Sequence, residues 1–301
     1  MSLGGNSIDA NGDGEAGGIL FTNFRTVSLS VIDGTSVFGF LFDSNRVSTD
    51  GTDIPIVGAR INVDGMPNVF AVTDENGFFR LEDVPSSDFF VEIDGREAIA
   101  PDGFSYGSAR ELFESVPGEE TQITNEGEVF DVYLPIIADA DATQIVQGQA
   151  TTATFGDSAL DNLEELFPDI DRSVWERLQV NIPADSITFD DGTAAEQVTV
   201  VALDPDRLPA PLPDHFDPTV VFSVDAGGAE NALGSSQLIY PNVNNLPPGA
   251  TTSILAFDHE AGEWVSTGSA TVSGDGLIIV SDEGAGVRTL GWRIVLSLIH
   301  I

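Results

Sequence analysis

Hydrophobic and polar residues alternate with a period of two along residues 38–94, which is the pattern of half-buried β-strands. The apolar residues that we expect to face a core are Ile61 and Val63, Phe70 and Val72, Phe79 and Leu81, and Val91 and Ile93. Between the second and third of these pairs, residues 73–77 read TDENG, in which Asn-Gly provides the positive φ of a tight turn. The pattern therefore predicts a β-hairpin at this turn.

Three motifs in the same stretch stand in a familiar order: Pro55-Ile56-Val57-Gly58-Ala59, the T-D-x-x-G-x-F motif at residues 73–79, and Val84-Pro85. Together they resemble the carboxypeptidase regulatory-like domain, here at about residues 37–95. The resemblance implies a seven-stranded prealbumin-like (CnaB-like) β-sandwich. It also implies a non-catalytic stalk or accessory module of extracellular and surface proteins, and it brings no active site with it.

The length of 301 residues suits two domains of ordinary size. Residues 1–18 are rich in Gly, Asn and Asp, which predicts a disordered linker. The first domain is then expected at residues 19–135, with a C-terminal extension in which a long excursion outside the core precedes the last strand. Its further elements are strands at 19–29 and 37–42, the excursion at 101–127, and a last strand at 129–135.

The second domain is expected at residues 136–295 and opens with helices. Apolar residues at spacings of three and four predict two short helices, at 157–165 and 170–178, with Pro168 between them and Asp157 or Asp161 as the first cap. The alternating pattern then returns and predicts a second sandwich. Its strands are expected at 198–203, 219–224, 237–240, 252–257, 263–267 and 276–281.

Residues 181–193 (NIPADSITFDDGT) resemble the Ile-Pro-Ala-Gly-Ala opening strand of ZU5-like sandwiches in bacterial multidomain surface proteins, with Asp185-Ser186 in place of Gly-Ala. The predicted fold class is therefore all-β. It consists of two tandem antiparallel β-sandwiches, prealbumin-like and then Ig-like or ZU5-like, with a short helical segment at about residues 157–178. Residues 296–301 (LSLIHI) match the translation of a sequencing adapter, which predicts a non-native tail on a fragment of a longer chain.

The net charge of −38 limits the kinds of partner that the chain can bind. Nucleic acid and anionic membrane surfaces are excluded, because both would repel such a chain. All eleven basic residues are Arg, and no apolar run approaches the roughly 20 residues of a membrane-spanning helix. Two interpretations of the acidity stay open: halophilic adaptation to a saline medium, or a surface that collects Ca²⁺. Cysteine is absent, which excludes disulfides and thiolate metal sites.

No cofactor is expected to be required, and calcium is the candidate metal ion. Residues 9–14 match the first half of an EF-hand loop, with Asp9, Asn11 and Asp13 as oxygen ligands, but Leu20 stands where the closing carboxylate belongs. A second candidate loop carries Asp50 and Asp53, and residues 204–206 (DPD) form a third. Oxygen ligands on loops are what Ca²⁺ prefers.

The catalytic motifs are incomplete. Gly156-Asp157-Ser158 resembles the nucleophile block of GDSL-type hydrolases, but no histidine stands in a matching block. His259-Glu260 lacks the second histidine of H-E-x-x-H, since Glu263 occupies that position, and residues 257–265 read better as a hairpin with Trp264 packed inward. With 49 acidic residues, adjacent carboxylates are expected by chance. We therefore predict no catalytic residue.

These observations predict a non-catalytic structural or adhesive segment of a larger extracellular or cell-surface prokaryotic protein, which spaces or presents other domains of the same chain. The alternative is an accessory module of a secreted hydrolase or peptidase that binds substrate or carbohydrate. A surface protein or a glycan is then the external partner. The aromatic residues considered for a sugar platform are Phe104, Tyr106, Phe113, Tyr133 and Tyr240.

Overall fold

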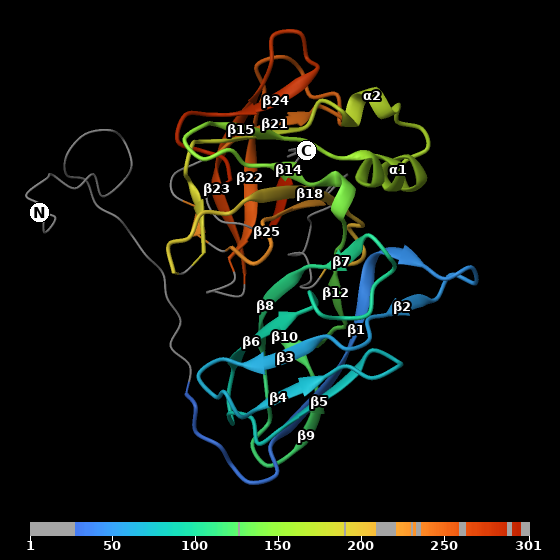
Figure 1. The fold of residues 1–301 in the computed structure, drawn as a ribbon, viewed down its shortest axis with the longest axis vertical. Coiled ribbons are helices and arrows are strands. Elements are labelled where there is room, and N and C mark those ends of the chain that lie inside the picture. Colours follow the sequence, from blue (N-terminus) through green and yellow to red (C-terminus); the bar gives the residue numbers. More distant parts are fainter. Residues whose placement is uncertain are drawn as a thin grey trace, which may run out of the picture.

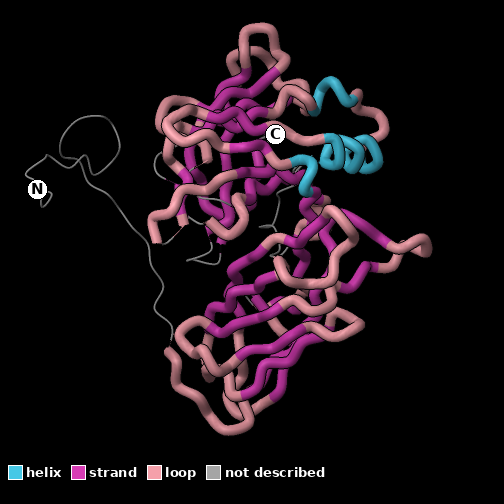
Figure 2. The backbone as a smooth tube through the Cα atoms, viewed as in Figure 1, coloured by secondary structure: helices cyan, strands magenta, loops and turns pink. Residues whose placement is uncertain are grey.

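The protein is an all-β structure of two lobes that follow one another along its longest axis (Figure 1). The computed structural model describes residues 28–125, 127–189, 191–208, 221–229, 231–232, 236–258, 263–287 and 291–295. The expected linker, most of the expected strand at 19–29 and the expected tail lie outside these residues. The predicted all-β fold class is confirmed, and the described helices are few and short (Figure 2). No described helix has the length and apolar content needed to span a bilayer.

The first lobe, which we call the first sandwich, is organised around one long strand. This strand, β1 (Ser36–Val47), pairs along its first half with β5 (Phe78–Glu82) and β9 (Glu120–Gln122), and along its second half with β2 (Asp53–Pro55) and β12 (Val132–Leu134). The pairings with β9 and β12 are parallel and the other two are antiparallel. The sheet is therefore mixed, although most of the fold is antiparallel.

A second sheet packs against the first across a shared apolar core. Its strand order is β4 (Phe70–Val72), β3 (Arg60–Val63), β6 (Phe89–Asp94) and β8 (Ser108–Phe113). Two smaller pairs complete the lobe: β7 (Phe104–Tyr106) with β13 (Ile136–Ala138), and β10 (Thr124–Asn125) with β11 (Glu128–Val129). The core includes Ile136 and Ile137, so the first sandwich continues just beyond Pro135.

One predicted inward pair was wrong. Phe70 and Val72 are 47% and 52% exposed, whereas Ala71 between them is buried. The cause is the register of β4 on β3, which places Ala71 opposite the buried Ile61. The guanidinium of Arg60 covers the exposed ring at 3.7 Å from its centroid, which is a cation–π contact. The other three predicted pairs face the core.

The predicted hairpin was also wrong, although its turn is present. The amide of Gly77 donates to the carbonyl of Asp74 at 3.0 Å, and Gly77 has a positive φ of 73°. The strands on either side do not pair with each other, because β4 belongs to the second sheet and β5 to the first. The turn therefore carries the chain from one sheet to the other. A side chain at Gly77 would also collide with the carbonyl of Leu41.

The expected excursion at residues 101–127 is part of the sandwich. It contains β7, β8 and β9, and Tyr106 and Phe113 are almost completely buried. Alternation in β8 is hidden because Glu111 occupies a core position between Ala109 and Phe113, with no exposed surface. A carboxyl group at an inward position made this strand look like a solvated loop.

The second lobe, or second sandwich, is a single hydrogen-bonded path of strands folded around its own core. A parallel bridge between Phe155 and Val200 brings the end of the path at β15 back to β18. Where strands were predicted, the structure has them. The order is β14 (Thr143–Gln144), β18 (Gln197–Leu203), β19 (Val221–Asp225), β25 (Gly291–Val295), β22 (Thr251–Asp258), β23 (Glu263–Val272), β24 (Ile278–Ser281), β21 (Gln237–Pro241), β16 (Gln179–Ile182) and β15 (Thr151–Ala153). A separate short pair joins β17 (Ile187–Thr188) to β20 (Asn231–Ala232).

The two predicted helices are α1 (Asp157–Leu166) and α2 (Arg172–Trp175), which lie on one side of the second sandwich after the 3₁₀ turn η1 (Asp139–Asp141) (Figure 2). The predicted first cap was wrong. The N-cap of α1 is Gly156, and the carboxylate of Asp141 accepts hydrogen bonds from the amides of Ser158 and Ala159. A Cβ at Gly156 would collide with the carboxylate of Asp141, so glycine permits this remote cap.

Asp185 lies in a turn whose backbone conformation favours glycine. The backbone of Asp185 has a positive φ of 54°, a region in which glycine is unstrained and Asp is tolerated. Its carboxylate accepts a hydrogen bond from the amide of Gly148 at 2.7 Å, which ties this turn to the preceding loop. The side chain of Asp185 therefore holds the turn against the loop at Gly148.

Candidate functional site: the joint between the two sandwiches

The clearest specialised feature of the described structure is the contact between the two sandwiches, which we call the joint. It begins with β18, a strand that is buried on both faces. Val198, Val200 and Ala202 point into the core of the second sandwich. Val201 and Leu203 point the other way and join the core of the first sandwich. One strand thus contributes to two cores.

Other residues of the second sandwich extend this apolar contact. Val221 of β19 and Leu255 and Phe257 of β22 belong to the core of the first sandwich, as does Leu208, which follows β18. The ring of Trp264 packs edge-on against Phe257 at 5.5 Å, as the hairpin interpretation predicted. Each fully buried side chain of this kind contributes about 1.5–3 kcal/mol relative to solvent exposure.

The C-terminal end of β1 forms the polar part of the joint. The hydroxyl of Ser44 donates to the carbonyl of Arg207 at 2.7 Å, and the side-chain amide of Asn45 donates to the carbonyl of Ala202. The side-chain oxygen of Asn45 also accepts from the amide of Ile136 at 3.3 Å. Asn45 therefore connects the end of β18 to the segment that leaves the first sandwich.

Arg207 closes one side of the joint. Its guanidinium makes an ion pair with Asp53 of the first sandwich at 2.7 Å and donates to the carbonyl of Arg46 at 3.2 Å. Both members of the ion pair are largely shielded from solvent, with 17% and 31% of the side chain exposed. The hydroxyl of Tyr133 donates to the other oxygen of Asp53 at 3.3 Å. Burial and the charge of Asp53 raise the pKa of Tyr133 to about 12, so the hydroxyl stays protonated.

A second polar group lies beneath the joint within the first sandwich. Asp43 is completely buried, and its carboxylate accepts from the guanidinium of Arg46 at 2.7 Å and from the hydroxyl of Tyr106 at 3.1 Å. Burial, followed by the negative charge of Asp43, raises the pKa of Tyr106 to about 12. The network satisfies the buried carboxylate and fixes the end of β1 that meets the second sandwich.

Arg96 forms a second polar bridge between the two sandwiches. Asp94 holds its guanidinium through two hydrogen bonds of 2.7 and 2.8 Å, and this contact lowers the pKa of Asp94. The guanidinium then reaches the carbonyl of Gly227 in the second sandwich at 3.5 Å. Here the joint encloses a cavity of about 60 Å³, lined in part by Tyr106, Asp225 and Thr199. Burial raises the pKa of Asp225, which Arg96 partly offsets.

The residues considered for calcium do not come together. Asp9, Asn11 and Asp13 lie outside the described residues. Asp50 is exposed in the turn after β1, where hydrogen bonds from Ser48 and Thr52 lower its pKa to about 2. Asp53 is engaged by Arg207. Among the described residues, no group of three or more acidic or histidine side chains is arranged to hold a metal ion.

The other candidates are also placed. Ser158 stands on the first turn of α1, and His215, His259 and His300 lie outside the described residues. Tyr106, Phe113 and Tyr240 are buried, so they cannot form a sugar platform; Phe104 is 38% exposed and Tyr133 is partly exposed.

Glu111 is not among the residues to which the sequence assigned a candidate role. Neither of its carboxyl oxygens has a hydrogen-bond partner in the described structure, and burial raises its pKa well above its ordinary value.

The joint was missed, although the sequence carries a signal for it. Residues 197–203 read QVTVVAL, in which the alternation of the first half gives way to the apolar run VVAL, and such a run is typical of a strand buried on both faces. In a domain with a solvated outer face, every second residue of this strand would be polar. The run therefore indicates that something packs against the outside of the sheet.

Comparisons with known proteins add little to this picture. No protein-family model matches the chain, and no curated protein matches it. Two solved structures of mutant type II cohesin–X–dockerin complexes from Acetivibrio cellulolyticus align with 44% and 45% of the chain and 72% and 73% of their own, at 20% and 18% identity and TM-scores of 0.23 and 0.22. A candidate carbohydrate-binding protein from Pseudomonas aeruginosa aligns over its whole length with 34% of the chain, at 13% identity and a TM-score of 0.23. Likenesses this partial carry no inference about function.

Proposed function

We propose that this chain is a non-catalytic structural segment of a larger extracellular protein, in which the two sandwiches act as one rigid spacer that presents neighbouring domains. The observation that supports this most strongly is the joint. Flexibly linked domains normally meet through modest, rather polar interfaces. Here, apolar side chains of the second sandwich belong to the core of the first, and two arginines bridge the sides. A spacer must be stiff if it is to hold the neighbouring domains at a fixed distance and orientation.

The proposed extracellular location and the proposed partners are supported by observations other than the joint. They follow from the resemblance of residues 37–95 to carboxypeptidase regulatory-like domains and from the strongly acidic composition. In this proposal, the partners are the other domains of the same chain, with adhesion to a surface protein as a further role. Calcium binding and salt adaptation stay predictions, to be tested by melting the protein with Ca²⁺, with chelator and with NaCl.

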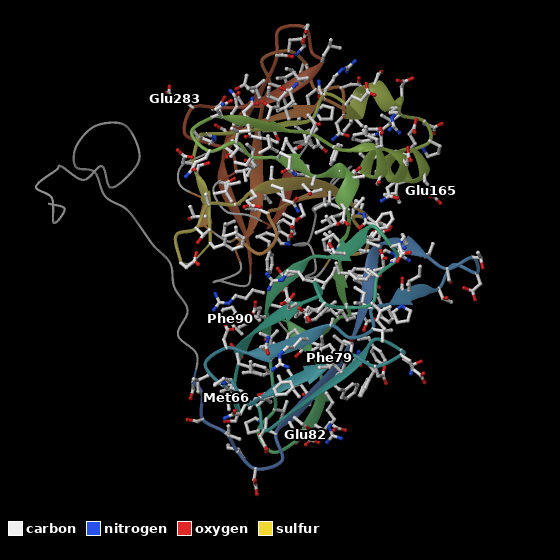
Figure 3. The ribbon with its side chains drawn as sticks, in the orientation of Figure 1. Met66, Phe79, Glu82, Phe90, Glu165 and Glu283 are labelled. Carbon is white, nitrogen blue, oxygen red and sulfur yellow. The ribbon has the colours of Figure 1, made fainter. Side chains whose placement is uncertain are left out.

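The rigidity can be measured directly because the chain has no cysteine. Spin labels on Glu82→Cys and Glu283→Cys would report across the joint, since these exposed residues lie in different sandwiches (Figure 3). We expect one narrow distance distribution by double electron–electron resonance. A broad distribution, like that of two domains on a flexible linker, would contradict the proposal. Labels on Glu82→Cys and Glu75→Cys, within the first sandwich, provide the control.

A further inference from the structure

The outer face of the first sheet carries a continuous row of aromatic side chains, which we call the aromatic face. In β1, Val37 and Leu41 point inward and are completely buried. The alternate residues therefore point outward, and three of them are phenylalanine. With neighbours from β5 and β12, the aromatic face consists of Phe38, Phe40, Phe42, Phe78 and Tyr133.

The five rings contact one another in sequence. Phe78 lies 6.0 Å from Phe38 and 5.5 Å from Phe40, measured between ring centroids. Phe40 and Phe42 are 6.1 Å apart with nearly parallel planes, and Phe42 lies 5.9 Å from Tyr133. All five are partly exposed, and none of them packs against the core of either sandwich. The face runs along β1 for about 13 Å at roughly 3.3 Å per residue.

The surroundings of this face are polar and mainly negative. Arg80 pairs across the sheet with Phe38, and its guanidinium is engaged by Glu120 at 2.6 Å and Glu82 at 3.5 Å. At the other end, the hydroxyl of Tyr133 is bonded to Asp53. Glu82 and Glu120 are 69% and 45% exposed, and carboxylates only accept hydrogen bonds, so this end of the rim offers acceptors to a ligand that carries donors.

We infer that the aromatic face binds a neutral polysaccharide chain. Sugar rings combine apolar C–H faces, which are attracted to the negative face of an aromatic ring, with hydroxyl donors that match the acidic rim. The net charge of −38 excludes polyanions. A second copy of the chain is a poor fit. The partly buried rings offer on the order of 300 Å². A stable protein interface needs about 800 Å² per partner. This inference does not depend on the proposed spacer function.

Binding is tested by calorimetric titration of the full chain with hexasaccharides of β-1,4-glucose, β-1,3-glucose, β-1,4-xylose and β-1,4-N-acetylglucosamine, with hexagalacturonate as the anionic control. We expect at least one neutral probe to bind and the anionic one not to bind. The double variant Phe40→Thr/Phe78→Thr should weaken that binding at least about tenfold. Phe70→Thr is the matched control, because Phe70 is an exposed strand residue on the other sheet and should leave the affinity unchanged.

Hydrogen exchange gives a readout that needs no variant: the bound hexasaccharide should slow amide exchange in β1 and β5 and leave β3 and β4 unchanged. Three results would overturn the inference. The first is the absence of binding by all the neutral probes, in which case the rings serve only as cross-strand pairs that stabilise the sheet. The second is an equal loss of affinity in Phe70→Thr. The third is self-association that the double variant abolishes, which would make the face an interface between copies.

Discussion

The two sandwiches differ in how complete their cores are. The core of the second consists only of its own residues, from Ala153 to Val287. The core of the first includes six residues that the second supplies, among them Leu203, Val221 and Phe257. The first core also contains Glu111, a buried carboxyl group with no hydrogen-bond partner among the described residues, whereas the buried polar atoms without a partner in the second are neutral, Trp175 Nε1 and Thr252 Oγ1. The comparison teaches that the first sandwich depends on the second, although each looks like an independent domain.

Removing an apolar contact at the joint should have the largest effect of a single substitution. Leu203→Ala should destabilise by about 2–5 kcal/mol, because a buried leucine is lost. The loss should appear as faster amide exchange in β1 and β8 of the first sandwich, although Leu203 is in the second. Leu163→Ala, an equally buried leucine in α1, should speed exchange in the second sandwich first. Unchanged exchange in β1 in Leu203→Ala would contradict the dependence.

Glu111 should make the first sandwich sensitive to pH. Burial raises its pKa above the ordinary value of 4.5, so above that pH the unfolded chain releases a proton that the native state keeps. Stability should therefore fall as the pH rises, by at most about 1.4 kcal/mol per unit, until the native group also ionises. Glu111→Gln should reduce this slope between pH 5 and 7 in urea titrations, and buried Asp225, whose pKa is also raised, accounts for part of what remains. Glu82→Gln, at an exposed site, should keep the full slope, and an undiminished slope in Glu111→Gln would contradict the assignment.

The ion pair at the joint should have the smallest effect. Arg207→Met removes the partner of Asp53 and should cost about 1 kcal/mol, since the pair is only partly buried. The difference in free energy of unfolding between this variant and the wild type should be smaller in 1 M NaCl, because charges are screened there within about 3 Å. Arg172→Met, which removes a cation bound to Asp157 and Asp161 on the helices, is the control and should leave amide exchange in the first sandwich unchanged.

The sequence predicts the strands and helices well where a single rule decides them. The period-two runs around Ile61, Phe79 and Val91 face the core, and Leu160 and Leu163 of α1 are buried as their spacing predicts. Errors occurred where tertiary contacts overrule the local pattern. The register of β4 turned Phe70 outward, and Glu111 hid β8 by placing a carboxyl group in an apolar core.

The joint and the aromatic face could not be derived from the sequence pattern alone. The apolar run at residues 200–203 indicates that another segment covers the sheet, but it does not say which segment does so. The aromatic residues of β1 are visible in the sequence, yet alternation alone does not say which face is the core. The core face is the one that packs against the opposing sheet, and in the structure this face carries Val37 and Leu41 rather than the phenylalanines.

The dependence of the first sandwich on the second is tested most directly by producing residues 28–138 and residues 139–295 separately and following the thermal unfolding of each by circular dichroism. The six shared side chains are worth on the order of 10 kcal/mol, comparable with the whole stability of a domain. We expect residues 139–295 to unfold cooperatively and residues 28–138 to show no cooperative transition. Cooperative unfolding of residues 28–138 at the midpoint found in the intact chain would contradict the account.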